Sequence, residues 1–509
     1  MSKNSQLKAG VILSYLNLLI GNIIPFIYTP VMLRILGQTE YGLYGIANSV
    51  MGYIGLLNFG IGSAILRYIS KYRAEGAVDK ERRVIGLFIK LYSAVALLIL
   101  IVGTTLSFHL DGYGRSLDPE ELDKLVVLVR LMTLNMAIFL PFSIFSSVTI
   151  AHEKYIFNRV TGVLSSIAAP CLNLAMLHCG FASVGLVLSS TLLNLISYAI
   201  YMIFCFNMLH ITPSFKKCES GLLKEIFVFS FFAFLGGIID ILYWSTDKLI
   251  IGWAIGPVAV AVYGIGATFN GYITNLSTAI SGILLPKITV ILTKDTPQKE
   301  LTELFIKVGR LQFIVISFIV SAFIVFGRQF IMLWAGEGYC ESYAVALFTM
   351  IPVTVPLIQN TGLNILMAMN KHHFRSIVYL AIAFLNILLT FFLVNKYGIV
   401  GAAFATCISY IIGNILIINW YYYNKIGLNI PLFWKNIFAM TPQMVVFIAL
   451  GLFVTQKVII DSWPLFFVGA VLYTLLYVGA AYFFMMNQYE KTLFTAPLKK
   501  MKARIFHEG

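Results

Sequence analysis

Long apolar segments recur along the whole chain and are separated by short polar connections. Most of these segments hold about 20 residues or more, and a helix of that length crosses a hydrocarbon core of ~30 Å. We predict about fourteen membrane-spanning helices, over residues 9–36, 42–69, 84–108, 123–150, 160–178, 182–207, 225–251, 258–285, 304–333, 343–369, 376–395, 399–422, 437–457 and 464–486. The pattern therefore predicts an all-α integral membrane protein.

The composition supports this fold class. Of the 509 residues, 59% are hydrophobic and 11% are charged, and the mean hydropathy is +0.87. An ordinary soluble domain has roughly 45–50% apolar and about 25% charged residues. The composition therefore excludes a soluble globular protein. The chain also lacks the sequence G-x-x-x-x-G-K-[ST], so we expect no ATP hydrolysis through a P-loop.

The net charge of +14 comes from basic residues that gather in alternate connections. Five Lys and Arg residues lie in residues 70–83 and five more in residues 487–509, whereas the connection at 109–122 is acidic. Because cytoplasmic loops carry the excess of Lys and Arg, both termini are expected to be cytoplasmic. The basic excess then reports topology and attraction to anionic membrane lipids, and we expect no nucleic-acid partner.

Short sequences repeat in the same order in the two halves of the chain. Tyr44-Gly45-Ile46 recurs as Tyr263-Gly264-Ile265, 219 residues later, and Val184-Gly185 recurs as Val400-Gly401, 216 residues later. A slowly drifting offset is typical of a duplicated unit with small deletions. Chance similarity of Gly and Tyr in membrane helices is the alternative.

The repeat predicts two six-helix lobes of the same orientation, related by an axis along the membrane normal. The last two spans are then an added hairpin. The expected domains are an N-terminal lobe at 1–217, a C-terminal lobe at 218–424, a helical hairpin at 425–486 and a basic cytoplasmic tail at 487–509.

Helix breakers follow the same twofold pattern. They lie in the first span and its counterpart, the seventh, and in the fourth span and its counterpart, the tenth: Pro25, Pro30, Gly236, Gly237, Pro141, Pro352 and Pro356. Paired breakers favour a central site with helices that bend during transport. Ordinary Pro and Gly of membrane helices are the alternative.

Ionisable residues inside the predicted spans are scarce, and each costs at least ~2.5–3.5 kcal/mol near the bilayer centre. The cations outnumber the acids in the set that we select as a candidate cavity lining: Arg34, Arg67, Lys90, Arg130, Lys248, Asp240 and Asp247. Asn58 and Asn270 add neutral donors. Snorkelling to the membrane interface is an equal alternative for Arg67, Lys90 and Lys248, and Asn side chains can instead join helices.

The six cysteines and seven histidines show no spacing of a metal site. No C-x-x-C sequence is present, and most of the cysteines lie in spans, where free Cys behaves as a small apolar residue. The pair His372-His373 lies in a short connection and is read as a solvated turn. We therefore expect no metal ligands and no catalytic residues.

Four motifs carry a resemblance to a known family: Leu36-Gly37-Gln38-Thr39-Glu40-Tyr41-Gly42, Phe59-Gly60-Ile61-Gly62-Ser63-Ala64-Ile65-Leu66-Arg67-Tyr68, Thr246-Asp247-Lys248-Leu249-Ile250-Ile251-Gly252 and Tyr397-Gly398-Ile399-Val400-Gly401-Ala402-Ala403. In this order they resemble the bacterial polysaccharide-transporter family, the O-antigen and oligosaccharide flippases, of the multidrug/oligosaccharidyl-lipid/polysaccharide (MOP) exporter superfamily. The second half has Ala259 and Val260 where the first has Glu40 and Tyr41, which argues against symmetric roles.

The resemblance implies two lobes around a central cavity, as in multidrug exporters of that superfamily, and no enzymatic activity. It implies an alternating-access flippase that moves undecaprenyl-diphosphate-linked oligosaccharide to the outer leaflet of the bacterial inner membrane. Its partners would be the lipid-linked glycan, membrane lipids and other membrane proteins of polysaccharide assembly. No cofactor is expected beyond a coupling Na⁺ or H⁺.

The cationic set suits such a cargo, because arginine binds a diphosphate in bidentate geometry and offsets its desolvation. Asp240 and Asp247 would tune those cations or carry the coupling ion. A lipid II flippase is the runner-up, since only the headgroup differs. A drug or cation antiporter would need acids in the first lobe, whose first span has Arg34 and no acid, and a glycan polymerase would need a larger external loop than 109–122.

Overall fold

The computed structural model describes residues 3–113, 116–219, 221–281, 284–293 and 297–493. Within these ranges every regular element is a helix, so the prediction of an all-α fold is confirmed. The basic tail predicted at 487–509 lies outside the described residues beyond residue 493.

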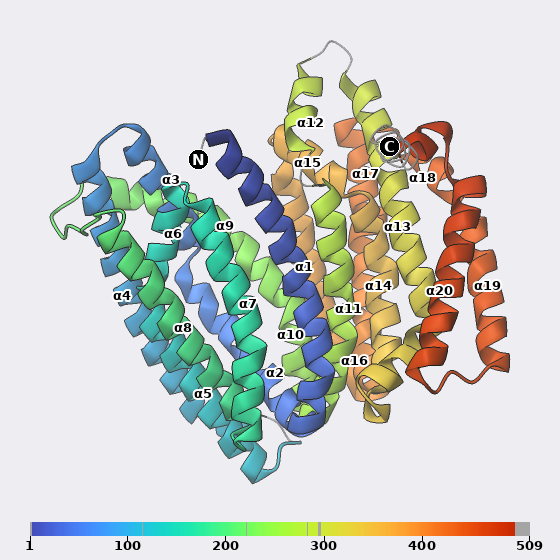
Figure 1. Ribbon diagram of the computed structural model, residues 1–509, viewed down its shortest axis with the longest axis horizontal. Coiled ribbons are helices and arrows are strands. Elements are labelled where there is room, and N and C mark those ends of the chain that lie inside the picture. The colour runs from blue at the N-terminus through green and yellow to red at the C-terminus, as the bar shows by residue number, and fades with distance from the viewer. Residues whose placement is uncertain (1–2, 114–115, 220, 282–283, 294–296, 494–509) are drawn as a thin grey trace, which may run out of the picture. The chain divides into compact units, whose positions relative to one another are not determined.

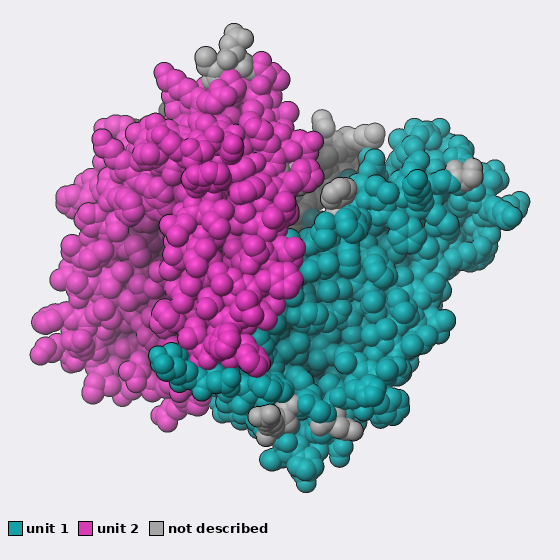
Figure 2. Space-filling model, turned by 180° about the vertical axis from the view of Figure 1, so that it is seen from behind, with its two compact units in different colours: residues 1–264, 394–399 teal, residues 265–393, 400–509 magenta. Residues whose placement is uncertain are grey.

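The chain divides into two compact units, which Figure 2 shows in different colours. Unit 1 comprises Met1–Gly264 and Val394–Ile399, and unit 2 comprises Ile265–Leu393 and Val400–Gly509. The boundaries of the expected domains at 217, 424 and 486 stay predictions.

Unit 1 is built from long antiparallel helices joined by short turns (Figure 1). They are α1 (Lys3–Leu36), α2 (Gln38–Gly55), α3 (Ile61–Ala74), α4 (Val78–Phe108), α5 (Pro119–Phe139), α6 (Ser143–Ala151), α7 (Tyr155–His178), α8 (Ala182–Asn207), α9 (Leu222–Trp244) and α10 (Thr246–Ala254), with 3₁₀ turns at Leu56–Asn58 and Leu110–Gly112. Within this unit α1 packs on α7, α4 on α5, and α7 on α8.

Unit 2 is organised around one long buried helix, α13. The helix α11 (Pro257–Ser281) leads into it, followed by α12 (Leu285–Leu292), α13 (Pro297–Trp334), α14 (Ser342–Ile358), α15 (Asn360–Ala368), α16 (His372–Tyr410), α17 (Asn419–Tyr421), α18 (Ile430–Phe438), α19 (Thr441–Lys457) and α20 (Trp463–Ala480). A 3₁₀ turn covers Glu337–Tyr339, and π-helical segments cover Ile411–Ile418, Tyr422–Ile426 and Ala481–Met485. The helix α13 packs against α14, α18, α19 and α20.

Eight helices of the described part of the chain are long and apolar enough to cross a membrane. The number rises to eleven if each of three bent helix pairs counts as one span. This agrees with a protein that crosses the membrane many times, whereas the count of fourteen stays a prediction.

The helix breaks explain why several expected spans consist of two pieces. The chain bends by 42° between α5 and α6, next to Pro141, and by 45° between α14 and α15, three residues after Pro356. A proline lacks the N–H that the preceding turn needs, so a helix is readily bent near it. In contrast, Pro25 and Pro30 remain inside α1.

The motif at Phe59-Gly60 is a left-handed turn that joins α2 to α3. Gly60 has a φ of +68°, and a β-carbon at this position would lie 2.7 Å from the backbone of Ser230 and Phe234 in α9. Only glycine allows both the conformation and this close approach. The glycine of the motif is thus required by packing within unit 1.

The hairpin of α19 and α20 exposes apolar side chains along most of its length, for example Phe453, Leu475 and Leu476. In water a patch of this kind would be unfavourable, because soluble proteins rarely expose large contiguous apolar surfaces. Lipid tails are as apolar as these side chains, so exposing the same surface to a bilayer carries no such penalty. The surface therefore identifies lipid as the solvent of this hairpin.

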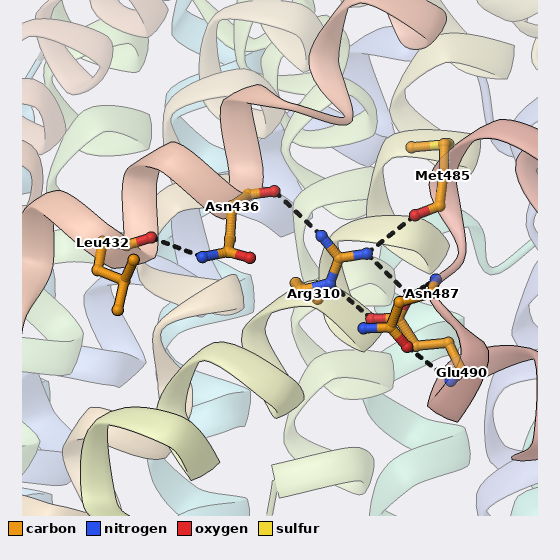
Figure 3. A network of polar contacts seen from close by, with 6 residues as sticks. All are labelled: Arg310, Leu432, Asn436, Met485, Asn487 and Glu490. Atoms are coloured by element: carbon orange, nitrogen blue, oxygen red, sulfur yellow. Dashed lines mark hydrogen bonds and ion pairs between the residues drawn. The ribbon is translucent and has the colours of Figure 1, made fainter. Parts of the chain in front are cut away.

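A buried ion pair fastens the end of the hairpin to α13 (Figure 3). Arg310 of α13 donates from Nε to Glu490 Oε1 at 2.7 Å and from Nη2 to Glu490 Oε2 at 2.9 Å. The guanidinium also donates to the carbonyl oxygens of Met485, at 2.9 Å, and Asn436, at 3.3 Å. The exposed fractions are 8% for Arg310 and 1% for Glu490. We call this group the Arg310 clamp.

Removal of one partner from the Arg310 clamp is expected to destabilise the fold. Glu490→Leu leaves the guanidinium buried and uncompensated, which costs about 3–5 kcal/mol, whereas Arg310→Met with Glu490→Leu recovers most of that loss. The measurement is the midpoint of thermal unfolding of the purified protein in detergent. Lys307→Met is the matched control, because Lys307 is an exposed cation on the same helix. Equal unfolding midpoints for the parent and the Glu490 variant would contradict this account.

Candidate functional site

Eight of the nine residues selected from the sequence lie in unit 1, and Asn270 lies in unit 2. Arg34 is exposed in the last turn of α1, where a cation is also favoured by the helix dipole. Asn58 is half-buried in the turn before Phe59-Gly60. Asn270 is fully buried in α11, where Thr274 donates to its carbonyl oxygen at 2.9 Å.

Arg67 and Lys90 are exposed cations on the adjacent helices α3 and α4. The guanidinium of Arg67 lies 4.4 Å from the ring centroid of Phe229 in α9. Lys90 donates from Nζ to the carbonyl oxygen of Phe215, at 2.8 Å, in the segment that links α8 to α9. The Lys90 side chain therefore holds this connecting segment, and its predicted place in a cavity stays a prediction.

The segment that Lys90 contacts lies along α4 as an extended strap, residues 208–219. Ser214 donates its N–H to the carbonyl oxygen of Arg82 at 2.9 Å, and Lys80 forms an ion pair of 2.6 Å with Glu219. The Lys80 ammonium lowers the pKa of the Glu219 carboxyl below its usual range. Since both groups are well exposed, solvent screening leaves the pair a small contribution to stability, present above the ordinary pKa of glutamate and lost as the pH falls.

Arg130 of α5 contacts the other end of α4. Its Nε donates to Ser107 Oγ at 3.0 Å, and the guanidinium lies 4.7 Å from the ring centroid of Phe108. Ser107 and Lys90 are seventeen residues apart on one helix, or roughly 25 Å at 1.5 Å per residue. Within unit 1 the predicted cations therefore form at least two separate groups and not one cluster.

The two predicted acids have different surroundings because α9 ends at Trp244 and α10 begins at Thr246. Asp240 is exposed on α9, whereas Asp247 is 2% exposed and accepts a hydrogen bond of 2.6 Å from the Tyr263 hydroxyl. Tyr53 of α2 and the Thr246 hydroxyl are hydrogen-bonded at 2.5 Å beside it. Asp247 thus belongs to a buried polar cluster on α2, α10 and α11.

Lys248 is half-buried on α10, and its side chain passes close to Gly264 of α11. A β-carbon added to Gly264 would lie 3.9 Å from Lys248 Cε. Within the selected set, Arg67 thus lies next to α9, Lys90 next to the strap and Asp247 next to Tyr263.

The sequence reasoning missed the role of Glu40 in unit 1. Its carboxylate accepts from the Lys124 ammonium, from the Ser183 N–H at 3.2 Å and from the Ser183 hydroxyl at 2.5 Å. These contacts join α2, α5 and the first turn of α8. Glu40, the acidic residue of the Leu36–Gly42 motif, is therefore a structural anchor of unit 1. The sequence indicates that this role is specific to the first half, because the matching position in the second half is Ala259.

A second pair that the sequence did not reveal joins α4 to the turn after α6. His152 Nε2 lies 2.7 Å from Glu81 Oε1, and Arg73 donates to the carbonyl oxygen of Ala151 at 2.5 Å. These contacts fasten the turns at one end of unit 1. In the described ranges no group of three or more His, Cys, Asp or Glu side chains is arranged to hold a metal ion.

Residues 7–292, more than half of the chain, match the family described as polysaccharide biosynthesis protein. The protein belongs to this family. One similar protein is a Shigella flexneri protein described as an O-antigen transporter. The two sequences are 22% identical over 399 residues, which cover 76% of this chain and 91% of that protein. The resemblance drawn from the four motifs is thus confirmed.

The fold of this polysaccharide biosynthesis family member is similar to the folds of two solved transporters, one of which is described as a member of the MOP superfamily. It is similar to the lipid II flippase MurJ in an inward closed conformation, with a TM-score of 0.67, 12% identity and coverage of 93% of this chain and 98% of that one. It is also similar to an inward-facing multidrug resistance MATE family transporter, with a TM-score of 0.62, 14% identity and coverage of 82% and 96%. These similar proteins are transporters and flippases rather than enzymes.

Glu40→Gln is expected to destabilise the family member by about 1–3 kcal/mol, because a neutral amide cannot replace the charge-assisted bond to Lys124. The measurement is again the midpoint of thermal unfolding in detergent. Glu120→Gln changes the net charge equally at an exposed acid in the first turn of α5 and should leave the midpoint unchanged. The anchoring role of Glu40 is wrong if the two variants unfold alike.

Proposed function

We propose that the protein is a flippase that moves a polyprenyl-diphosphate-linked oligosaccharide from the cytoplasmic to the outer leaflet of a bacterial inner membrane. Alternating access carries the headgroup across, and both termini face the cytoplasm. The observation that supports this most is the excess of cations over acids among the charges within the predicted spans of unit 1. Membership of the polysaccharide biosynthesis family supports the same cargo class.

The chemistry of the cargo fits the cations. A lipid-linked glycan has a diphosphate and a hydrated sugar chain that hydrocarbon excludes, whereas its tail stays in lipid throughout. Arg130 and Arg67 are exposed and have no carboxylate partner among the described residues, so their guanidinium groups can bind phosphate oxygens. Their aromatic neighbours, Phe108 and Phe229, hold each guanidinium plane without neutralising its charge.

The acids would couple movement of the lipid to an ion gradient. Asp240 is exposed on a span, and a carboxylate there can take up H⁺ or Na⁺ during the cycle. Lys248 and Arg34 would complete the electrostatic surroundings of the headgroup. The alternatives, a lipid II flippase and a multidrug or cation antiporter, have no comparable support, since their similarity to this chain is one of fold.

Flipping of a fluorescent undecaprenyl-diphosphate-oligosaccharide in liposomes tests the proposal. The parent protein should move the lipid to the opposite leaflet, and Arg130→Ala should slow the movement by about 10–100-fold, the equivalent of one lost charge-assisted hydrogen bond. Lys154→Ala is the matched control, because Lys154 is an exposed cation in the connection before α7. If the parent leaves the lipid in place but exports a small organic cation, the cargo is wrong.

The coupling role of Asp240 has its own test in the same liposomes. Asp240→Asn should make flipping independent of an imposed H⁺ or Na⁺ gradient. The reason is that a neutral amide has no negative charge for either ion to neutralise. Glu120→Gln should respond to the gradients as the parent does. A gradient response that survives in the Asp240 variant would remove Asp240 from the coupling mechanism.

A further inference from the structure

Unit 2 holds a guanidinium with no acidic partner in the described part of the chain. Arg375 lies in the first turn of α16 and is half-buried. Its Nη2 donates to the Tyr379 hydroxyl at 3.0 Å, and the guanidinium lies 4.5 Å from the centroid of the same ring. Arg310 of the same unit has Glu490 as its counter-charge, and Arg375 has only a neutral phenol.

Arg375 lines a narrow pocket formed entirely within unit 2. Tyr379 comes from α16, Gln359 and Asn360 from the break between α14 and α15, and Asn414 from the π-helical segment Ile411–Ile418. Pro356, Leu363, Ile418 and Tyr422 supply the rest of the wall. We call this space the Arg375 pocket. Segments of π-helix are rare and are frequent at functional sites.

The hydrogen bonds among Arg375, Tyr379 and Asn414 leave one buried donor of the pocket unused. The Tyr379 hydroxyl accepts from Arg375, so its own hydrogen goes to Asn414 Oδ1, at 2.6 Å. This fixes the orientation of the Asn414 amide and leaves its Nδ2, on a residue that is 1% exposed, without a partner in the described part of the chain. A buried donor in this state costs about 1–3 kcal/mol unless a ligand accepts from it.

Polar side chains next to Asn414 are bonded to one another. Gln359 donates to Asn419 Oδ1 at 2.8 Å, and Trp434 donates to the same oxygen at 3.1 Å. Asn419 in turn donates to the carbonyl oxygen of Asn414 at 3.0 Å. These groups bond to one another, and Asn414 Nδ2 still has no partner among the described residues. An acceptor from outside the chain can therefore bind this amide together with the Arg375 guanidinium.

We propose that the Arg375 pocket binds a phosphate group of a lipid, with one phosphoryl oxygen between the Arg375 guanidinium and Asn414 Nδ2. The space holds about 10 Å³, enough for about one water-sized atom. A single oxygen can therefore enter while the rest of the headgroup stays at the mouth, and a sugar is excluded.

The surroundings favour an anionic lipid over a soluble anion. Lys371 and Lys425 are exposed at the same end of α16, where Lys371 donates to the carbonyl oxygen of Lys425 at 3.4 Å. Clusters of basic residues at the end of a membrane helix attract lipid phosphates. The phosphate can belong to the lipid-linked cargo or to a bilayer lipid, so this site goes beyond the proposed function and does not require it.

Equilibrium binding to the purified full-length protein in detergent, followed by native mass spectrometry, tests the site. The probes are undecaprenyl diphosphate, phosphatidylglycerol and undecaprenol, which has the same tail without phosphate. Arg375→Met should weaken binding of a phosphate-bearing lipid at least about tenfold and leave undecaprenol unchanged. Asn414→Leu should weaken it less, because a neutral donor is lost. Lys457→Met, with the same loss of charge at an exposed position in the last turn of α19, should change binding less than about twofold.

The two sources of the phosphate give different results. Loss confined to undecaprenyl diphosphate assigns the pocket to the cargo, and loss for phosphatidylglycerol as well assigns it to bilayer lipid. Unchanged binding of both lipids to Arg375→Met and to Asn414→Leu overturns the proposal. Arg375→Met should fold, since it removes an unpaired cation from low dielectric, and Asn414→Leu gives an independent reading. Because this assay needs no transport, its failure is distinguishable from failure of flipping in liposomes.

Discussion

The cost of an ionised group in a low-dielectric surrounding governs how this chain uses its few charges. An ion in hydrocarbon must be paired, hydrogen-bonded or brought to water, and each solution occurs in the two units. Arg310 is paired with Glu490 and two carbonyl oxygens, and Glu40 is paired with Lys124 and Ser183. Asp247 is satisfied in part by the Tyr263 hydroxyl.

A second class of charges has aromatic or neutral partners and, among the described residues, no carboxylate. Arg67 lies over Phe229, Arg130 over Phe108, and Arg375 over Tyr379. An aromatic face attracts a cation but leaves its N–H groups available, so such an arginine keeps the capacity to bind an external anion. This difference between arginines gives the proposal of an anionic cargo its physical basis, and it separates Arg310, a structural residue, from the others.

Much of the fold follows from the lengths of the apolar segments. Membrane helices satisfy their own backbone, so a run of about 20 apolar residues predicts a helix with little help from tertiary structure. The turn at Gly37 and the bend near Pro141 also follow from local rules for glycine and proline. The limits arise where one span breaks in two, as at Phe59-Gly60, because the break depends on the close approach of α9.

The candidate site was less accessible to sequence reasoning, because pairing depends on residues that are far apart in the chain. Arg310 lies inside the predicted span 304–333, and nothing near it indicates that Glu490 will neutralise it. Arg375 directly precedes the predicted span 376–395, and only the placement of Asn414 beside Tyr379 in the structure reveals the pocket. The selected residues of unit 1 are located by the structure, but their role in transport stays a prediction.

The central claim is that Arg130 lies in a water-accessible place that receives the anionic headgroup during transport. Reaction of Arg130→Cys with a charged, membrane-impermeant thiol reagent in liposomes tests it most directly. Leu475→Cys on the apolar surface of α20 serves as the lipid-facing reference, and the parent protein gives the background from its own exposed cysteines, Cys171 and Cys179. The account predicts rapid reaction at position 130, slow reaction at position 475, and protection of position 130 by undecaprenyl-diphosphate-oligosaccharide. Equal reaction at the two positions, or reaction at position 130 that the lipid-linked glycan does not slow, would contradict it.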